Sequence, residues 1–444
     1  MNRTAIVEGF RTGFCKQGTF LRDIPADILG AMVVKEMIAR LNVWGLKPST
    51  IDYVVGSNVT TPPHAPTIAR VAAVKGGLPK LIPAQNITQN CGSGISAVDY
   101  GSNLIKIGRH ETVLVVGVES MSQVPLFYAD TIKKDLEAFA YAKNWQEKTK
   151  IFARFLPKQI KVWQKEYQPK AGLLLGFTDP ICGLTMGLTA ENLAKDPSLG
   201  ITRKKQDDFA FFSHQKAKQA QKLLAEEICP FYLPNGNKYS CVDSDNGIRK
   251  DPQPEAFAKA KPFFDKRYGT VTAGNSSQIT DGAACILLMN EEKAKALGLP
   301  ILGYVVNYTD AGFEPEIMGL SPVGAIAKIL KQSEMALKDF SVVEINEAFA
   351  AQTLACLKTM SSNLLMKKYF FQDYGFDTAL GEIDSQNFNP NGGAIALGHP
   401  IGVSGMRLII TALKELARRN GDRALVSACI GGGQGNAMIL ERSR

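Results

Sequence analysis

The sequence predicts a layered α/β protein that contains two similar domains. Short runs rich in Val and Ile alternate with longer apolar-periodic segments, which is typical of strands alternating with helices. The same order of segments occurs before residue 121 and again after residue 300, and each copy includes a glycine-rich segment. We therefore expect an internal duplication of a domain of about 120 to 150 residues.

The first copy contains four predicted elements around one glycine-rich segment. A strand AIVEGF is followed by a helix DILGAMVVKEMIARL, a strand IDYVVGSNV, the segment around Cys91 and a strand ETVLVVGVES. The second copy repeats this order as ILGYVVNYT, SPVGAIAKILKQSEM, FSVVEINEAFA, GGAIALGHPIGVSGMRLIITALKEL and RALVSACIGGGQGNAMILE. Two regions fall outside the repeat, an insert at about 123–264 and a surface excursion at about 358–386.

Composition describes an ordinary globular protein. The 444 residues are 45% hydrophobic and 21% charged, and the formal net charge of +9 suits an anionic partner such as nucleic acid, a membrane surface or a phosphate-bearing substrate. The eight cysteines form no C-x-x-C pair, so neither a zinc site nor a disulfide framework is indicated. Without an apolar leader or a membrane-spanning run, we expect a cytoplasmic protein.

Cys91 lies in NCGSGISAVDYGSNLI, where a polar approach leads into a glycine-rich turn. Ile95, Val98 and Leu104 then recur at helical intervals, so Cys91 should lie at the amino terminus of a helix. There the helix dipole and free backbone N–H groups favour the thiolate, which predicts a nucleophile. The alternative is a small core residue, the usual role of a lone cysteine.

His399 lies in NPNGGAIALGHPIGVSG, a long stretch of small residues. Such a stretch brings backbone close to a ligand, so His399 is the candidate general base, with a structural histidine as the alternative. The remaining histidines, His64, His110 and His214, have no comparable surroundings and are interpreted as structural.

Cys429 lies in SACIGGGQG, where a predicted strand ends before three glycines. A dinucleotide-binding loop is excluded, because Asn436 takes the place of its last glycine. A thiol beside close-approach backbone N–H groups predicts an oxyanion hole, and a buried cysteine at a strand end is the alternative.

Asn346 and Glu347, in INEAFAAQ, follow the strand that repeats IDYVVGSNV. Duplicated α/β folds place reactive groups at strand ends. The Asn346 side chain can therefore hold a water or a carbonyl, or it can cap the next helix.

Together, these four motifs strongly resemble the thiolase family. NCGSG, NEAFAAQ, GGAIALGHPIGVSG and CIGGGQG match its motifs in identity, order and spacing, and GTVTAGNSSQITDGAA is similar to its coenzyme A loop. The resemblance covers essentially the whole chain, so the structural alternatives for these residues lose most of their weight.

The resemblance implies a thiolase fold. This fold has two similar βαβαβαββ core domains in a layered α/β/α/β/α arrangement, with a mostly helical loop domain inserted in the first. On this basis we expect an N-terminal core at 1–122 and 265–292, an inserted loop domain at 123–264 and a C-terminal core at 293–444.

The resemblance also implies an acyltransferase reaction, thiolytic cleavage of a 3-oxoacyl-CoA by coenzyme A or the reverse Claisen condensation. His399 takes the proton of Cys91, whose thiolate keeps the shortened acyl group, and Cys429 protonates the departing acetyl-CoA carbanion. Asn346 stabilises the enolate through a water that it shares with His399, and the N–H groups of Cys91 and Gly431 form a second oxyanion site. Coenzyme A is a substrate, and no metal or redox cofactor is implied.

Weaker similarities concern the substrate. Ser277 matches a serine near the pantetheine arm, and Met186, Met318 and Phe349 match apolar positions around the acyl site. Thr185 replaces the histidine of short-chain biosynthetic thiolases. The extended insert, DNGIR and FDKRYGTVTAGNSS are more similar to β subunits of trifunctional fatty-acid oxidation complexes.

These departures predict a degradative 3-ketoacyl-CoA thiolase, with a biosynthetic acetoacetyl-CoA thiolase as the alternative. A non-catalytic lipid-carrying homologue and a decarboxylating ketoacyl synthase are disfavoured, because all four reactive residues are present. No motif supports nucleic-acid binding.

We expect a homodimer or homotetramer. The aromatic and basic stretch from Leu136 to Tyr167 suggests a further partner, either a hydratase/dehydrogenase α subunit or a peripheral membrane surface. Phe152, Phe155 and Trp163 are the expected anchors for a protein, and Lys148, Lys150, Lys158 and Lys161 the expected cations for a membrane.

Overall fold

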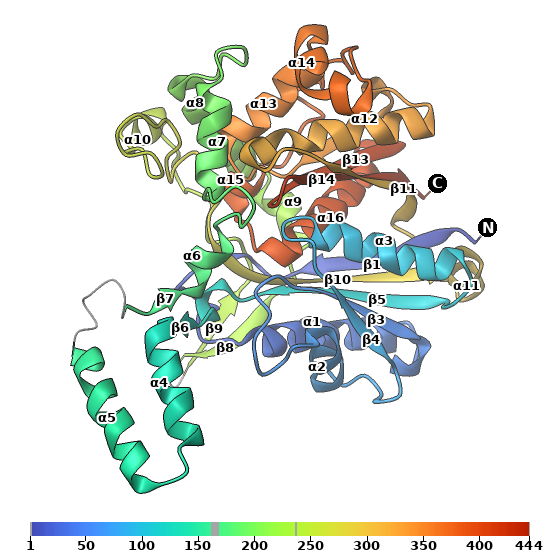
Figure 1. The fold of residues 1–444 in the computed structure, drawn as a ribbon. Helices are drawn as coiled ribbons and strands as arrows, with labels where there is room; N and C mark the ends of the chain where they lie inside the picture. Colours follow the sequence, from blue (N-terminus) through green and yellow to red (C-terminus); the bar gives the residue numbers. More distant parts are fainter. Residues whose placement is uncertain (1, 161–167, 236–237, 444) are drawn as a thin grey trace. The chain divides into compact units, whose positions relative to one another are not determined.

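In the computed structural model, which describes residues 2–160, 168–235 and 238–443, a ten-stranded sheet is the framework of the larger of two units (Figure 1). This unit comprises Met1–Gln123 and Asp179–Arg444. The strand order is β12-β13-β14-β11-β1-β10-β5-β3-β4, and β2 pairs with β10.

The elements of the first half are β1 (Thr4–Arg11), β2 (Cys15–Lys16), α1 (Ala26–Val43), β3 (Tyr53–Ser57), α2 (Ile68–Lys75), β4 (Ala84–Ile87), α3 (Ser93–Lys106), β5 (Thr112–Glu119) and β10 (Thr280–Asn290). Those of the second half are α11 (Glu291–Ala296), β11 (Gly303–Gly312), α12 (Ser321–Ser333), β12 (Val342–Ile345), α13 (Ala350–Met360), α14 (Asn363–Tyr374), α15 (Ala394–Leu397), α16 (Ile401–Arg419), β13 (Arg423–Ile430) and β14 (Gln434–Arg442). Between β5 and β10, the larger unit also contains α7 (Met186–Lys195), α8 (Arg203–Gln219), α9 (Gln221–Ala225), β8 (Phe231–Asn235), β9 (Lys238–Val242) and α10 (Pro254–Ala258).

The sheet repeats one pairing pattern in its two halves. In the first half, β10 lies antiparallel between β1 and β5, and β5 pairs with β3 in parallel. In the second half, β14 lies antiparallel between β11 and β13, and β13 pairs with β12 in parallel. The halves join where β1 pairs antiparallel with β11. The duplicated fold expected from the sequence is therefore confirmed.

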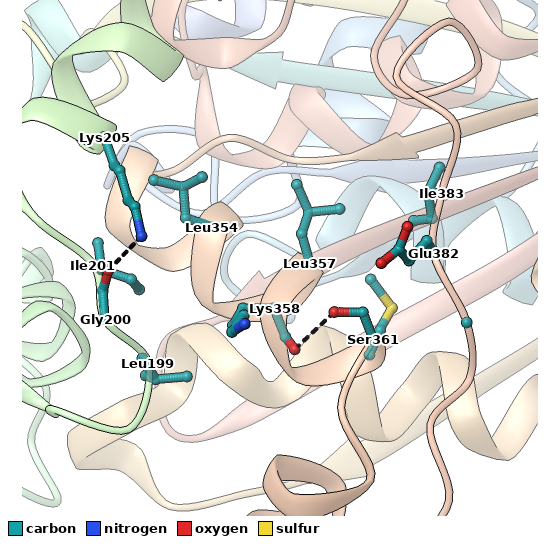
Figure 2. A pocket seen from close by; sticks show the side chains of 12 residues that line it. Leu199, Gly200, Ile201, Lys205, Leu354, Leu357, Lys358, Ser361, Glu382 and Ile383 are labelled. Carbon is teal, nitrogen blue, oxygen red and sulfur yellow. Dashed lines mark hydrogen bonds between the residues drawn. The ribbon is translucent and has the colours of Figure 1, made fainter.

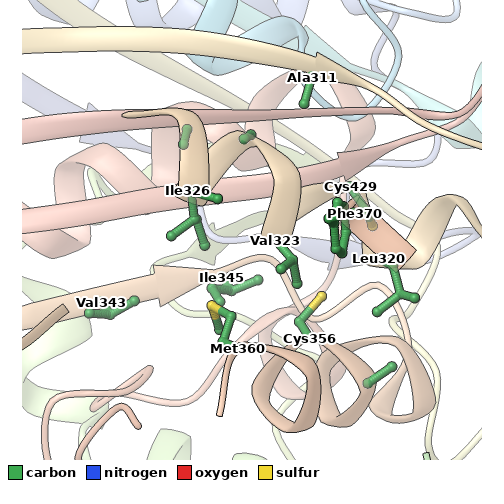
Figure 3. Close-up of a cluster of buried hydrophobic side chains, with 14 of the residues drawn as sticks. Ala311, Leu320, Val323, Ile326, Val343, Ile345, Cys356, Met360, Phe370 and Cys429 are labelled. Atoms are coloured by element: carbon green, nitrogen blue, oxygen red, sulfur yellow. The ribbon is translucent and has the colours of Figure 1, made fainter. Parts of the chain in front are cut away.

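Helices form three layers around the two halves of the sheet (Figure 1). One buried cluster lies under α1 and α2, a second surrounds α3 and α16, and a third lies under α12, α13 and α14 (Figure 3). Strands contribute to two clusters at once. Along β5, Leu114 and Val116 face the first cluster, whereas Val113 and Val115 face the second. This alternation follows from the two-residue period of a strand and explains why these strands are apolar throughout.

Helices α3 and α16 approach each other through one glycine from each. A Cβ on Gly94 would lie 2.8 Å from the backbone nitrogen of Met406, and a Cβ on Gly405 would lie 2.5 Å from that of Ile95. Both glycines follow a serine in the first turns of their helices, in CGSG and GVSG. Only glycine permits this backbone contact, because any side chain would occupy the space of the other helix.

Of the region 123–264, residues 124–178 form the second compact unit, and residues 179–264 belong to the larger one. The second unit contains β6 (Leu126–Phe127), α4 (Asp130–Tyr141), α5 (Trp145–Ile160), β7 (Lys170–Ala171) and α6 (Gly172–Gly176). Strands β6 and β7 pair antiparallel. No helix in the described part of the chain is long and apolar enough to cross a membrane.

We expect Gly405→Ala to lower the free energy of unfolding by about 1–3 kcal/mol, because the added methyl group overpacks the helix crossing. Chemical denaturation measures this change. Gly312→Ala is the control, since a Cβ at Gly312 meets no described atom within 4 Å. Equal stability of Gly405→Ala and the wild type would show that the crossing is loose.

Candidate active site

Cys91 lies two residues before the first residue of α3, so its predicted place at a helix amino terminus agrees with the structure. Asn90, which precedes it, has a positive φ of 44°. The Cys91 side chain is half-buried. The turn lies against the loop after β13, because the Asn90 side-chain amide donates to the carbonyl of Gly431 at 2.9 Å and that of Asn436 donates to Gly92 at 3.1 Å.

The lowered pKa expected for Cys91 is wrong. Burial raises the pKa of the thiol to about 11, and the negative charge of Glu119 acts in the same direction. The backbone N–H groups of Gly431 and of Cys91 itself donate toward the sulfur and lower the pKa, but less than burial raises it. Cys91 is therefore a thiol at rest and needs a base at the moment of attack.

His399 lies between α15 and α16, where its backbone N–H donates to the carbonyl of Gln278 at 3.0 Å. Its Nδ1 is 2.5 Å from Oγ of Ser404, and that hydroxyl lies 3.1 Å from the carbonyl of Pro400, to which it can donate. When the Ser404 hydroxyl donates its hydrogen bond to the Pro400 carbonyl, its oxygen can accept one from Nδ1–H of His399. In this tautomer Nε2 keeps a free lone pair. Nε2 is buried and has no hydrogen-bond partner among the described residues.

The electrostatics of His399 suit a base. Burial lowers its pKa to about 4, and the positive charge of Arg407 acts in the same direction. The imidazole is therefore neutral at physiological pH. Ser404, which the sequence interpretation did not single out, lies one turn into α16 and fixes which nitrogen carries the proton.

Cys429 is a fully buried residue of β13, one position before the end of the strand. Burial raises its pKa well above the usual value, and interactions with Cys91 and Cys356 act in the same direction. Two thiolates would repel each other, so ionisation of one of the two thiols, Cys91 or Cys429, disfavours ionisation of the other. Figure 3 shows Cys429 among the apolar side chains of the cluster under α12 to α14.

Asn346 directly follows β12, and its backbone N–H donates to the carbonyl of Ser427 at 2.9 Å. Its side chain is fully buried, and neither Oδ1 nor Nδ2 has a hydrogen-bond partner in the described part of the chain. The helix-cap alternative is wrong, because α13 begins at Ala350 with Phe349 as its N-cap. Both polar atoms are thus available to a ligand.

Glu347 has a structural role. Its buried carboxylate accepts hydrogen bonds from the Ser213 hydroxyl at 2.6 Å and the Asn389 side chain at 2.9 Å. Burial raises its pKa. The network joins β12 to α8 and to the segment before α15.

The proposed substrate contacts share the apolar surroundings of Cys429. Met318 and Phe349 belong to the same buried cluster, and Met186 packs against it. Met186 also lies beside the glycine loop, since a Cβ on Gly431 would be 3.2 Å from its sulfur. Ser277 is half-buried, and its N–H donates to the carbonyl of Ala348 at 2.9 Å.

Glu119, at the end of β5, is a buried carboxylate that sequence reasoning missed. It accepts from the N–H of Gly402 in α16 at 2.9 Å, from that of Val59 at 3.1 Å and from that of Thr60 at 2.9 Å. Burial raises its pKa. Glu119 ties the first turn of the helix that follows His399 to the loop after β3. A lone glutamate in an apolar strand gave no signal for this role.

The other three histidines make structural contacts, as expected. His64 lies 3.2 Å from the carboxylate of Asp27, His110 stacks on Tyr53, and Nδ1 of His214 accepts from the backbone of Arg249.

The structure contains a cavity of about 360 Å³ between α13 and the segments beside it (Figure 2). None of the nine predicted site residues lines it. Its walls come from the loop before α8, the end of α13 and the segment after α14, with Leu199, Ile201, Leu354, Leu357, Lys205 and Lys358 among the lining residues.

The comparisons with known proteins agree with this geometry. Residues 4–292 match the thiolase N-terminal domain and residues 299–442 match the thiolase C-terminal domain. The chain therefore belongs to the thiolase family and is an acyltransferase, which confirms the class predicted from the four motifs.

Among its relatives is a 3-ketoacyl-CoA thiolase of Yersinia enterocolitica, 37% identical over 99% of this chain and 97% of that protein. A 3-ketoacyl-CoA thiolase of Pseudoalteromonas translucida is similar at 37% identity, with the same coverage of both chains. Human mitochondrial 3-ketoacyl-CoA thiolase has a TM-score of 0.82 at 32% identity, covering 100% of this chain and 99% of that one. Acetyl-CoA acetyltransferase of Bacillus anthracis has a TM-score of 0.82 at 31% identity, with the same coverage.

The rate at which iodoacetamide alkylates Cys91 in the free protein should rise steadily from pH 7 and reach half of its maximum only near pH 11. The thiolate is the reacting form, and its fraction follows the raised pKa of about 11. Peptide mass spectrometry of Cys91 against pH measures this profile. A short cysteine peptide, whose rate is half-maximal at about pH 8.5, serves as the reference. A plateau for Cys91 below pH 8 would show that the helix terminus outweighs burial.

Proposed function

We propose that this chain cleaves 3-oxoacyl-CoA with coenzyme A, and runs the reverse condensation, through an acyl group carried on Cys91. The proposal is carried by one observation, the interaction of two thiols, those of Cys91 and Cys429, whose pKa values are both raised. His399 supports it, because this histidine is neutral and has a free Nε2. A nucleophile, a base and a separate proton donor are what a two-step acyl transfer requires.

In the first half-reaction, Nε2 of His399 takes the S–H proton of Cys91, and the thiolate attacks the 3-oxo carbon. The bond between C2 and C3 breaks, and its electron pair leaves with the acetyl-CoA carbanion. The raised pKa of Cys429 keeps that residue protonated, so it can donate its proton to C2. Cys91 retains the shortened acyl group as a thioester.

In the second half-reaction, the Cys429 thiolate takes the proton of the coenzyme A thiol. The coenzyme A sulfur attacks the acyl carbon, and the bond to Cys91 breaks. The proton on His399 returns to the Cys91 sulfur. The site therefore regains its starting protonation, and no net proton enters or leaves.

Two sets of donors stabilise negative charge. The unpartnered Asn346 side chain, with a water that His399 shares, stabilises the enolate oxygen of acetyl-CoA. The N–H groups of Cys91 and Gly431, which donate toward the Cys91 sulfur, stabilise the oxyanion formed when the thiolate attacks. Preorganised donors of this kind act most strongly where water is excluded.

For the substrate class, we propose 3-oxoacyl-CoA longer than acetoacetyl-CoA and a degradative role in fatty-acid oxidation. Relatives named 3-ketoacyl-CoA thiolase support this proposal, as does Thr185, the N-cap of α7, in place of a histidine. The alternative is an acetyl-CoA acetyltransferase, the name of a solved neighbour at 31% identity. Thiolysis rates across 3-oxoacyl-CoA chain lengths distinguish the two.

Brief exposure to acetyl-CoA should leave an acetyl adduct on Cys91, and Cys91→Ala should lack it in intact-mass measurements. Cys429→Ala should still carry the adduct but lose about 10² to 10⁴ in the exchange of deuterium into acetyl-CoA, because proton transfer at the α-carbon is its task. An adduct that persists in Cys91→Ala, or unchanged exchange in Cys429→Ala, would contradict these roles.

We also propose a homo-oligomer and a cytoplasmic location. Strand β4 supports the first, because it forms an edge of the sheet, and unpaired edges favour association with another strand. Eight free cysteines support the second, since disulfides are rare in the cytosol.

The helical unit at 124–178 supports the proposed docking surface for a hydratase/dehydrogenase subunit or an anionic membrane. Its exposed apolar side chains include Tyr141, Trp145, Phe152 and Leu156. Lys148 lies over the Phe139 ring, and Arg154 pairs with Asp135 at 2.6 Å. The proposed contacts Trp163, Lys158 and Lys161 lie outside the residues whose side chains the structure describes.

Two sets of variants, one that removes aromatic anchors and one that reverses lysine charges, should show whether the unit binds a protein partner or a membrane. Trp145→Ala and Phe152→Ala should weaken co-purification with a protein partner, because few aromatic anchors dominate an interface. Lys148→Glu combined with Lys150→Glu should instead abolish flotation with anionic vesicles in a salt-dependent way. Tyr239→Ala, an exposed aromatic of the larger unit, is the control. If no variant changes either readout, the unit has no docking role.

A further inference from the structure

The glycine loop between β13 and β14 is held by three separate segments, one for each of its glycines. Asn90 donates to the carbonyl of Gly431 at 2.9 Å, and Asp179 accepts from the N–H of Gly432 at 2.8 Å. At Gly433, the carbonyl accepts from the N–H of Phe313 at 2.6 Å.

The first two bonds act on the same peptide unit. The carbonyl of Gly431 and the N–H of Gly432 belong to one planar peptide, so this plane is clamped from both ends. Gly432 has a φ of 93° and Gly433 a φ of 74°, and glycine alone leaves such a segment many accessible conformations. The clamp, rather than the local sequence, therefore selects the orientation of the loop.

Asp179 is suited to hold that plane. It is buried, and its second oxygen, Oδ1, accepts from the N–H groups of Ile181 at 2.8 Å and Cys182 at 3.3 Å. Its own backbone N–H donates to Leu184 at 2.8 Å. The hydrogen bonds within its own turn thus hold the Asp179 carboxylate in place independently of its bond to Gly432.

We propose that Asp179 and Asn90 are positioning residues, which orient the Gly431–Gly432 peptide so that the adjacent Gly431 N–H faces the reacting atoms at Cys91. This inference deepens the proposed function and rests on it. The N–H of Gly431 belongs to the peptide immediately before the clamped one. If the Gly431–Gly432 peptide rotated, the Gly431 N–H would therefore turn away from the Cys91 sulfur, toward which it now donates.

Loss of the clamp has two consequences that a merely structural role lacks. An oxyanion formed on the substrate loses a preorganised donor, which lowers kcat more than it raises KM. The resting Cys91 sulfur loses an N–H that favours its thiolate, so its alkylation slows. The second consequence requires no substrate and no turnover.

The test compares Asp179→Ala, Asp179→Asn and Asn90→Ala with the wild type. Asparagine keeps the shape of Asp179 but has only one acceptor oxygen for the N–H groups of Gly432 and Ile181. We expect a fall in kcat of about 10-fold to 10²-fold for thiolysis, with KM changed less than about threefold. We also expect iodoacetamide to modify Cys91 about tenfold more slowly at pH 8, as one lost hydrogen bond to a thiolate would produce.

Two controls complete the design. Asp384→Ala removes a carboxylate that also accepts a backbone N–H in its own turn, from Gln386 at 2.8 Å, and should leave both readouts unchanged. The double variant Asn90→Ala with Asp179→Ala should be no worse than the poorer single variant, because both act on one peptide.

The results distinguish failure of the positioning role from failure of the proposed reaction. If folded Asp179 variants, including Asp179→Asn, alkylate at the wild-type rate and keep kcat, the positioning role is wrong while thiolysis stands. If the wild type does not cleave 3-oxoacyl-CoA, the proposed reaction is wrong. Slower alkylation in the variants would still support the clamp on Gly431.

Discussion

The backbone contact between Gly94 and Gly405 is the constraint on which the site depends. It lets α3 and α16 cross at the centre of the fold without intervening side chains. Cys91 precedes the first helix and His399 the second, so the crossing fixes how far apart their backbones can lie. The two halves of the sheet enclose this pair, and the apolar cluster around both helices keeps the arrangement rigid. The geometry of the proposed site is therefore a consequence of helix packing.

Burial determines the protonation states of the groups collected there. It raises the pKa of both thiols and lowers that of His399, so all three groups are neutral before substrate arrives. Separated charges would be unstable in such surroundings. Proton transfers are therefore expected to accompany bond formation and bond breaking, when the substrate itself carries the compensating charge. The orphaned amide of Asn346 fits this scheme, because it offers hydrogen bonds without adding a charge.

The sequence predicted the fold, which the structure confirms, and it marked the proposed reactive residues, because both signals are local. Alternating apolar periods revealed the duplication, and short motifs marked Cys91, Asn346, His399 and Cys429. What it missed depends on contacts between distant segments. Asp179 meets Gly432 across 253 positions, and Glu119 meets Gly402 across 283, so no local pattern marks either carboxylate. The pKa of Cys91 was predicted in the wrong direction for the same reason, since the helix terminus is local whereas burial is a property of the whole fold.

The two halves have a serine at the equivalent position, but the two serines make different hydrogen bonds. The duplicated fold is asymmetric at this position. Ser93, in CGSG, accepts from the N–H of Gln89 and donates to the carbonyl of Asn90, so it shapes the turn that carries Cys91. Ser404, at the same place in GVSG, holds the ring of His399 instead. Helix α16 begins three residues before its serine, whereas α3 begins at its own. Equivalent serine-glycine turns thus lie beside the proposed nucleophile in one half and the proposed base in the other, and the different helix starts give each serine a different partner.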